Sequence, residues 1–333
     1  MAIETALTDA FGLDHPIAAA PMALVSGGGL AAAVSNAGGL GFVGGGYGDH
    51  AWMRDQLSAA RSEAGGSWGV GLITWHTSPE TVRLALDYEP DSFLLSFGDP
   101  RPYVDAIKEA GCVLFCQVQG VEDARAAAAA GADFIVAQGT EAGGHGAEGY
   151  GTLTLVPAVV DAVAPTPVLA AGGIVDGRGL AAALVLGSQG AMMGTRFYAS
   201  KEALGHERVK ERLVTARGDE TRRTRVFDAV RGLEWPEGYT GRALRNAFTE
   251  RWENREGELA AALDTEGQIF RKAVREGDTD TAVVWAGEAV GLISDVPSAG
   301  ELVRRVSAEA EARLRFDAST PNEASRARQR DTR

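Results

Sequence analysis

Short apolar runs alternate with alanine-rich stretches of helical composition eight times within the first 200 residues. The apolar runs, which we expect to be strands, lie at residues 17–20, 41–43, 68–73, 93–97, 113–118, 134–137, 168–171 and 190–193. Strands that are apolar along their whole length are typical of a parallel sheet covered by helices. Eight strand–helix units in about 200 residues predict an α/β fold of the closed (β/α)8 type, the TIM barrel.

A doubly wound open sheet is the alternative fold for such an alternation. The early glycine cluster Gly44-Gly45-Gly46 does not form a G-x-G-x-x-G motif at the start of a helix. In addition, no acidic residue closes a second strand at the distance that a dinucleotide site requires. We therefore favour the barrel.

Charged residues divide the chain into two parts. Residues 1–200 contain 8 basic and 20 acidic residues, whereas residues 201–333 contain 24 and 25. We expect residues 1–200 to form the barrel and residues 201–285 to form a mainly helical insertion that closes over its mouth as a lid. Residues 286–316 have apolar side chains at helical spacing and should return to the barrel, whereas residues 317–333 are polar and should be frayed.

The composition limits the partners of the chain. Its net charge of −13 disfavours nucleic acid and anionic membranes. No apolar run reaches the roughly 18 residues of a membrane span, and the first residues lack a signal-peptide pattern, so we expect a cytoplasmic protein with a small-molecule substrate. Cys112 and Cys116 are the two cysteines and are expected to be buried thiols. We predict no metal site, and we leave open whether the chain forms a homo-oligomer.

Glycine turns follow the seventh and eighth expected strands. Gly172 and Gly173 come directly after residues 168–171, and Gly194 with Thr195 comes after residues 190–193. In this fold the carboxyl ends of these two strands commonly hold phosphate. Exposed backbone N–H groups, a threonine hydroxyl and a helix amino terminus therefore predict an anion-binding nest.

A glycine-rich loop after the sixth expected strand contains His145. Glu141 precedes this histidine by four residues, and the loop from 138 to 146 contains four glycines. An imidazole in such a loop has the chemistry of a general base or of an electrostatic partner for a bound ligand. A solvent-exposed loop histidine is the alternative, which we disfavour because the glycines suggest backbone lying flat against a planar ligand.

Together these motifs resemble the nitronate monooxygenase family, formerly called 2-nitropropane dioxygenases. The resemblance covers residues 13–197 and the chain from residue 291 onward, and is carried by Pro21-Met22, the loop 138–145, Gly172-Gly173 and Gly194-Thr195-Arg196-Phe197. It implies a barrel that binds FMN. By this resemblance, His145 matches the active-site histidine, backbone near residues 20–22 lies along the isoalloxazine, and Gln117 reaches the flavin edge. The FMN-binding residues that it implies are Ala20, Pro21, Met22, Gln117, Gln138, Gly139, Gly144, Gly172, Gly173, Gly194 and Thr195.

Two features depart from the family pattern. Many relatives carry an asparagine in the third strand, where this chain has Gly71, so another group must contact the flavin there. No lysine precedes Lys108. Stabilisation of an anionic flavin would therefore fall to an arginine, a helix amino terminus or backbone N–H groups.

Other polar and aromatic residues carry weaker signals. Trp75 and His76 follow the third expected strand and either line the pocket or pack at its rim. Arg222, Arg223 and Arg225 form a basic cluster among many acidic residues, for which we favour a solvated surface.

The leading functional hypothesis is an FMN-dependent monooxygenase that uses O2 to oxidise alkyl nitronates to a carbonyl compound and nitrite, with nitroalkanes as further substrates. An NAD(P)H-dependent FMN reductase acting on quinones or enoyl thioesters is one alternative. A non-catalytic flavin-binding module is another, and it would leave the combination of the nest and His145 unexplained.

Overall fold

The structure of the chain is a computed structural model that describes residues 3–315. The tail expected at residues 317–333, and the last residue of the segment 286–316, lie outside the described residues. Within residues 3–315, no helix has both the length and the apolar character needed to cross a membrane.

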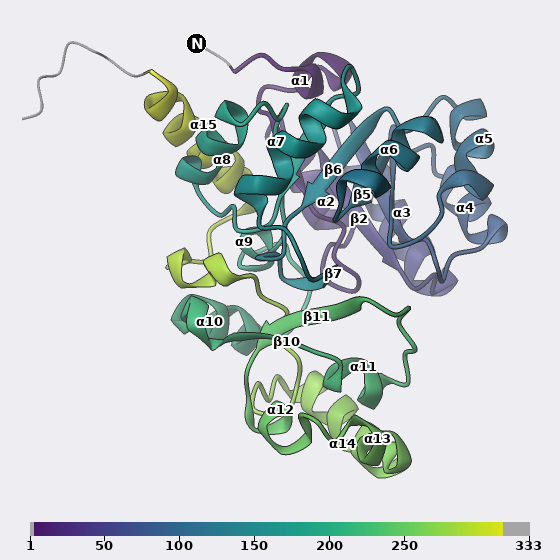
Figure 1. The fold of residues 1–333 in the computed structure, drawn as a ribbon, viewed down its shortest axis with the longest axis vertical. Coiled ribbons are helices and arrows are strands. Elements are labelled where there is room, and N and C mark those ends of the chain that lie inside the picture. Colours follow the sequence, from purple (N-terminus) through teal and green to yellow (C-terminus); the bar gives the residue numbers. More distant parts are fainter. Residues whose placement is uncertain (1–2, 316–333) are drawn as a thin grey trace, which may run out of the picture.

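Eight parallel strands form the barrel that the sequence predicts (Figure 1). They are paired in the order β1-β9-β8-β6-β5-β4-β3-β2. The ring closes between its two ends, because the Leu40 N–H donates to the Ile17 carbonyl and the Ala19 N–H donates to the Leu40 carbonyl, each at 2.9 Å. The strands are β1 (Ile17–Ala19), β2 (Gly41–Gly46), β3 (Trp68–Ile73), β4 (Ser92–Ser96), β5 (Val113–Val118), β6 (Phe134–Gln138), β8 (Val168–Ala171) and β9 (Ala191–Met193).

Helices between these strands cover the outside of the barrel. Several begin at a capping side chain: Ser78 Oγ accepts a hydrogen bond from the Thr81 N–H at 3.2 Å, and Asp49 caps the helix that follows it. A helix at Ala6–Phe11 (α1) precedes the barrel strands. The covering helices are α2 (Gly28–Ser35), α3 (His50–Glu63), α4 (Pro79–Leu86), α5 (Arg101–Glu109), α6 (Val121–Ala129), α7 (Thr152–Val163) and α8 (Gly177–Val185).

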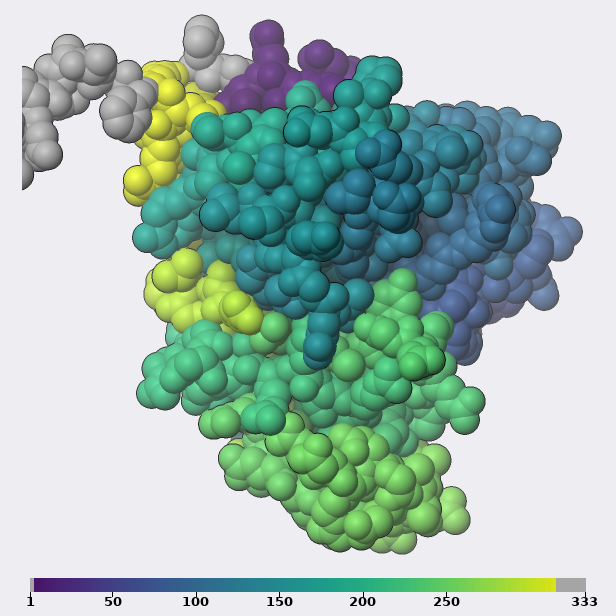
Figure 2. Space-filling view, in the orientation of Figure 1, coloured from purple at the N-terminus to yellow at the C-terminus, as the bar shows by residue number. Residues whose placement is uncertain are grey.

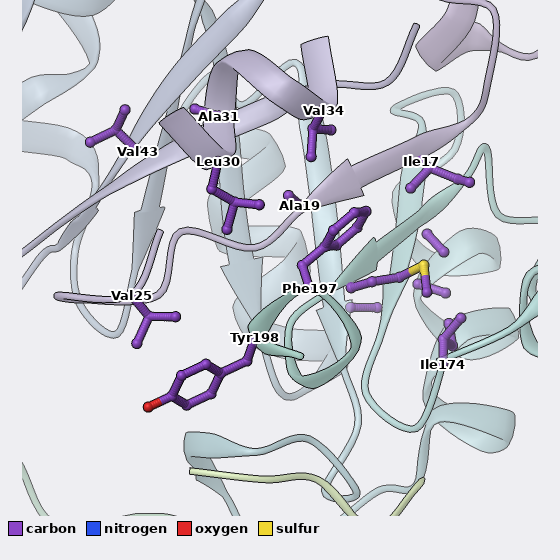
Figure 3. Close-up of a cluster of buried hydrophobic side chains, with 14 of the residues drawn as sticks. Ile17, Ala19, Val25, Leu30, Ala31, Val34, Val43, Ile174, Phe197 and Tyr198 are labelled. Carbon is purple, nitrogen blue, oxygen red and sulfur yellow. The ribbon is translucent and has the colours of Figure 1, made fainter. Parts of the chain in front are cut away.

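The hydrophobic core has two layers around the strands. Phe42 and Phe115 pack inside the barrel with their rings edge to face, 5.6 Å apart. The outer layer joins strands to helices, as where Leu30 and Val34 of α2 lie over the strand that carries Ala19 (Figure 3). Cys112 and Cys116 belong to this outer layer, as predicted, and burial raises the pKa of their thiols to about 11 and about 12. Both thiols are therefore protonated and unreactive at neutral pH.

The segment between the barrel and the last helix contains most of the remaining helices and has its own core, in which Phe227, Phe248 and Phe270 pack together. In Figure 2 it forms the green body below the barrel. Its elements, with the short helices that flank it, are α9 (Thr195–Tyr198), α10 (Glu207–Thr215), the 3-10 turn η1 (Gly218–Glu220), β10 (Thr221–Thr224), α11 (Val226–Arg231), β11 (Tyr239–Leu244), α12 (Ala247–Trp252), α13 (Glu256–Ala261), α14 (Leu263–Glu276) and η2 (Glu288–Leu292).

A second, antiparallel sheet was not predicted. It has the order β10-β11-β7, and its strand β7 (Gly144–Ala147) comes from the barrel loop that contains His145. His145 is therefore in a strand paired with Gly241 of β11, and the expectation that it lies in a loop was wrong. The tetrapeptide of β7 is too short and too rich in glycine to show strand periodicity, which is why the pattern gave no signal.

The last described helix, α15 (Ala299–Leu314), packs against α8 and α2 on the flank of the barrel. The sequence predicted this return but placed the helical pattern from residue 287 onward. Instead, the helix begins after Ser298, whose Oγ accepts a hydrogen bond from the Glu301 N–H at 3.3 Å. A 3-10 turn, η2, lies before it.

Candidate active site

A cavity lies at the carboxyl ends of the barrel strands, between the barrel and the second sheet. Gly139 does not line this cavity. Its N–H donates to the Ala171 carbonyl at 2.9 Å, and a side chain at this position would meet Thr152. The cavity brings together the other residues singled out from the sequence, namely Ala20, Pro21, Met22, Gln117, Gln138, Gly144, His145, Gly172, Gly173, Gly194 and Thr195.

The two glycine turns present backbone donors to one end of this cavity. Among the described residues, no acceptor is found for the N–H groups of Gly172, Gly173, Gly194 and Thr195. Gly172 and Gly173 have φ values of 99° and 71°, a conformation that favours glycine. Unpartnered donors in a concave turn fit a phosphate group. The Thr195 Oγ1 accepts from the Gly287 N–H at 3.0 Å and can still donate its own proton.

Glutamines from neighbouring strands form the wall beside the nest. Gln138 Oε1 accepts hydrogen bonds from Gln117 Nε2 at 3.1 Å and from Gln119 Nε2 at 2.7 Å. Gln138 Nε2 donates to the His145 carbonyl at 3.1 Å, which ties β6 to β7. Gln117 Nε2 uses one of its two N–H groups in this network, so its carbonyl oxygen and its other N–H remain for a ligand.

The absence of an asparagine in β3 has a steric cause. A Cβ atom at Gly71 would lie 2.2 Å from Cγ of Pro21. Such a contact is far below any van der Waals distance, so the proline ring occupies the space of a side chain at this position. Pro21 and Gly71 are therefore matched to each other.

His145 forms a hydrogen-bonded pair with Asp228, which the sequence did not reveal. His145 Nε2 lies 2.9 Å from Asp228 Oδ1 and 3.0 Å from Oδ2, and the two side chains are 9% and 5% exposed. Glu141, the expected neighbour, instead accepts from the N–H and hydroxyl of Thr152. Asp228 lies in α11, among the many acidic residues of the charged segment, so nothing in the sequence distinguishes it.

Two tryptophans enclose the histidine ring. Trp235 stacks on His145 with 3.6 Å between ring centroids and 5° between planes, and Trp285 lies 5.1 Å away. Desolvation by this burial lowers the pKa of His145, and the hydrogen bond that its Nε2 donates to Asp228 opposes the decrease. The imidazole is therefore neutral at pH 7. With its Nε2 on Asp228, no described residue hydrogen-bonds its Nδ1.

An aromatic wall completes the side of the cavity next to His145. Trp235 Nε1 donates to the Tyr47 hydroxyl at 3.1 Å, and Phe97 packs edge-on against Trp235 at 5.1 Å. Trp75 and His76 do not belong to the lining. Trp75 packs against Trp235, and the exposed His76 hydrogen-bonds the Tyr47 carbonyl at 3.0 Å, so both residues have packing roles outside the lining.

We predicted that the basic cluster Arg222, Arg223 and Arg225 lies on a solvated surface, and one of these residues does not. Arg222 and Arg225 are exposed, as expected. Arg223 instead turns inward and donates to the carbonyls of Thr140 and Gly146, each at 3.0 Å. Burial lowers its pKa to about 10. Arg223 therefore holds the second sheet to the barrel loop that carries His145.

The fold and the cavity define a TIM-barrel enzyme, because barrels of this type carry their chemistry at the carboxyl ends of the strands. The family model described as nitronate monooxygenase matches residues 4–74 and 73–309. A nitronate monooxygenase of Neurospora crassa is 38% identical over 344 residues, which cover 90% of each chain. The chain therefore belongs to the nitronate monooxygenase family. It is an oxidoreductase, and its family implies a flavin cofactor.

Two solved structures are similar over almost the whole chain. FabK from Thermotoga maritima has a TM-score of 0.83 and 32% identity, covering 98% of this chain and 99% of that chain. Nitroalkane oxidase from Streptomyces ansochromogenes has a TM-score of 0.80 and 30% identity, covering 95% and 100%. The segment beyond the barrel is thus part of the shared fold.

Proposed function

We propose that this chain is an FMN-dependent monooxygenase that uses O2 to oxidise alkyl nitronates, and more slowly nitroalkanes, to a carbonyl compound and nitrite. One observation carries the proposal. A single cavity is lined both by an unpartnered set of backbone donors, at Gly172, Gly173, Gly194 and Thr195, and by His145, which Asp228 holds from outside the lining. The first is suited to a phosphate-bearing cofactor and the second to a substrate beside it.

The residues present fit FMN. The glycine turns would hold the phosphate, the backbone at residues 20–22 would lie along the ring system, and Gln117 would accept a hydrogen bond from its edge. FMN, when bound, supplies the redox chemistry of the reaction. Because Pro21 fills the space beside Gly71, backbone and glutamine groups take the place of the asparagine that many relatives carry.

His145 is the acid–base group of the proposed reaction. Asp228 accepts the Nε2 proton and thereby fixes the tautomer in which Nδ1 has its lone pair free. A neutral imidazole can take a proton from the carbon next to a nitro group, which a nitroalkane requires. A nitronate has already lost this proton. His145 then serves mainly to orient the substrate.

The segment 201–285 acts as the lid in this proposal. Arg231, Trp235 and Trp285 line the cavity from this side, and the stack of Trp235 on His145 covers the imidazole. Residues in this arrangement exclude water from the reacting groups. Trp285 also packs against the core of the segment, with its ring 5.8 Å from that of Phe227, so this residue contributes to stability as well.

Product analysis of the purified protein with propyl-1-nitronate in air tests the function. We expect oxygen consumption together with propanal and nitrite. His145→Ala should keep FMN and lose about 10²–10⁴-fold in turnover of 1-nitropropane, with a smaller loss for the nitronate. His76→Ala is the matched control, since this histidine lies near the mouth but outside the lining. Equal rates for His145→Ala and the unmodified protein on both substrates would contradict the proposed role.

A further inference from the structure

The charge of the cavity is opposite to that of the chain. The protein has 45 acidic and 32 basic residues, but within the described part of the chain the cavity lining has no carboxylate and one formally charged side chain, Arg231. A cation in the wall of a site attracts anions, and the counter-ion of Arg231, Asp228, lies outside the lining. The cavity is therefore electrostatically suited to a negatively charged substrate.

Arg231 is held in place without using all of its donors. It is the last residue of α11, and its guanidinium lies over the Tyr47 ring at 5.2 Å. Its Nη1 is 3.8 Å from Asp228 Oδ1, which is an ion-pair distance and longer than a hydrogen bond. A guanidinium has five N–H donors in a rigid plane, so it retains donors for a ligand.

The same carboxylate places Arg231 beside the acid–base histidine. Asp228 Oδ1 contacts His145 Nε2 at 2.9 Å and Arg231 Nη1 at 3.8 Å. Asp228 itself is outside the lining, whereas both of its partners belong to it. The guanidinium and the imidazole therefore stand together at one wall, in front of the carboxylate that orients them.

This arrangement matches the shape of a nitronate. A nitronate carries its negative charge on two oxygens of a planar group whose nitrogen is bonded to the reacting carbon. Arginine binds such planar, two-oxygen anions through a pair of parallel N–H···O hydrogen bonds. Because Arg231 and His145 both line the cavity and both contact Asp228, a nitronate bound to Arg231 would lie beside His145.

We propose that Arg231 binds the two nitronate oxygens and makes the site select the anion over the neutral nitroalkane, an inference that rests on the proposed function. Arg231 contacts Tyr47 and Asp228 and belongs to the aromatic wall, whereas the unpartnered donors of the nest come from Gly172, Gly173, Gly194 and Thr195. It is therefore assigned to the substrate and not to the phosphate.

Butyrate is an unreactive probe for this site. It has the heavy-atom skeleton of propyl-1-nitronate, with a carboxylate carbon in place of the nitrogen, and butyramide is its uncharged counterpart. We expect calorimetry on the protein saturated with FMN to show butyrate binding more tightly than butyramide. Arg231→Gln should weaken butyrate binding about 10- to 100-fold, the range for losing hydrogen bonds to a charged group, and leave butyramide unchanged. The butyrate affinity of Arg231→Lys should lie between those of Arg231→Gln and the unmodified protein.

Arg225→Gln is the matched control, because Arg225 flanks the same helix and is exposed. Thermal melting of each variant shows whether it folds. Equal butyrate affinity in Arg231→Gln and the unmodified protein would overturn the inference, as would absence of butyrate binding to the unmodified protein. Loss of FMN from Arg231→Gln would also overturn it by assigning the residue to the cofactor. The binding result does not depend on turnover, so an Arg231 effect in a protein that fails to oxidise nitronates would refute only the proposed function.

Discussion

His145 Nε2 lies 2.9 Å from Asp228 Oδ1, although the two residues are 83 positions apart in the chain. The pairing of β7 with β11 brings them together, because it joins the barrel loop to the segment that contains α11. The charged segment is therefore more than a cover for the cavity. It supplies the carboxylate that fixes the protonation pattern of the histidine.

Asp228→Asn tests this role. An asparagine amide can donate to Nε2, which would move the imidazole proton to Nδ1 and remove the lone pair of Nδ1. We expect the turnover of 1-nitropropane to fall by up to the 10²–10⁴-fold that a general base contributes, with FMN content unchanged. Asp219→Asn, at an exposed carboxylate of η1, should have no effect. Steady-state rates on both substrates measure the difference.

The pH profile should reflect the lowered pKa of His145. Burial lowers this pKa below the ordinary value of 6.5, so the base stays deprotonated to a lower pH. The acid limb of kcat/KM for 1-nitropropane should therefore have its midpoint below pH 6.5. Asp228 raises this pKa, and Arg231 and Arg223 lower it, so Arg231→Gln should move the limb toward higher pH. A midpoint above 6.5 in the unmodified protein would contradict the buried, neutral imidazole.

The lowered pKa of His145 also predicts how the free energy of unfolding depends on pH. Because the folded state has the lower pKa, the unfolded state binds more protons as the pH falls below 6.5. The contribution of His145 to the free energy of unfolding is therefore complete above pH 6.5 and decreases as the pH falls through the lowered value. His145→Gln should show a weaker loss of stability in this acidic window, as measured by denaturant titration at several pH values.

Gly173→Val tests the nest. Gly173 has a φ of 71°, which a β-branched residue adopts only with strain, so the backbone should rotate and turn its N–H away from the cavity. We expect FMN retention to be lost. Gly111→Val is the matched control, because Gly111 has a φ of 78° but ends helix α5 away from the cavity. Equal FMN content in the two variants would show that backbone strain, and not the nest, decides retention.

Gly71→Asn tests the match between Gly71 and Pro21. The new Cβ would lie 2.2 Å from Pro21 Cγ, so β1 and β3 must move apart at the cavity. We expect a loss of about 1–3 kcal/mol in the free energy of unfolding, the usual cost of overpacking, together with weaker FMN binding. Gly257→Asn, at an open position of α13, is the control. If Gly71→Asn unfolds with the same free energy as the unmodified protein, Pro21 can move to make room for the new side chain.

The barrel was predictable because its strands are continuous apolar runs, such as residues 113–118, and this signal is local to each strand. The positions of the nest and of His145 followed from the same pattern, since the carboxyl end of each strand is known once the strand is found. Asp228 and Arg231 could not be predicted in the same way. Their places depend on the pairing of β7 with β11. These two strands are far apart in the sequence, and β7 has no apolar periodicity.

The inward turn of Arg223 has a similar cause. In sequence, Arg223 is one of three basic residues in a charged segment, and charge alone predicts exposure. In the structure its guanidinium donates to the carbonyls of Thr140 and Gly146 in the barrel loop, and Arg242 also donates to the Thr140 carbonyl, at 3.2 Å. Long-range packing of backbone acceptors therefore decides the orientation of this side chain.

Anaerobic mixing of the FMN-saturated protein with propyl-1-nitronate, NADH or NADPH in separate stopped-flow experiments tests the central claim most directly. The proposed function predicts rapid bleaching of the flavin absorbance by the nitronate and no comparable bleaching by either nicotinamide nucleotide. Rapid bleaching by NADH or NADPH with none by the nitronate would contradict it and assign the chain to the flavin reductases. A flavin left oxidised by all three would contradict it in favour of a binding module.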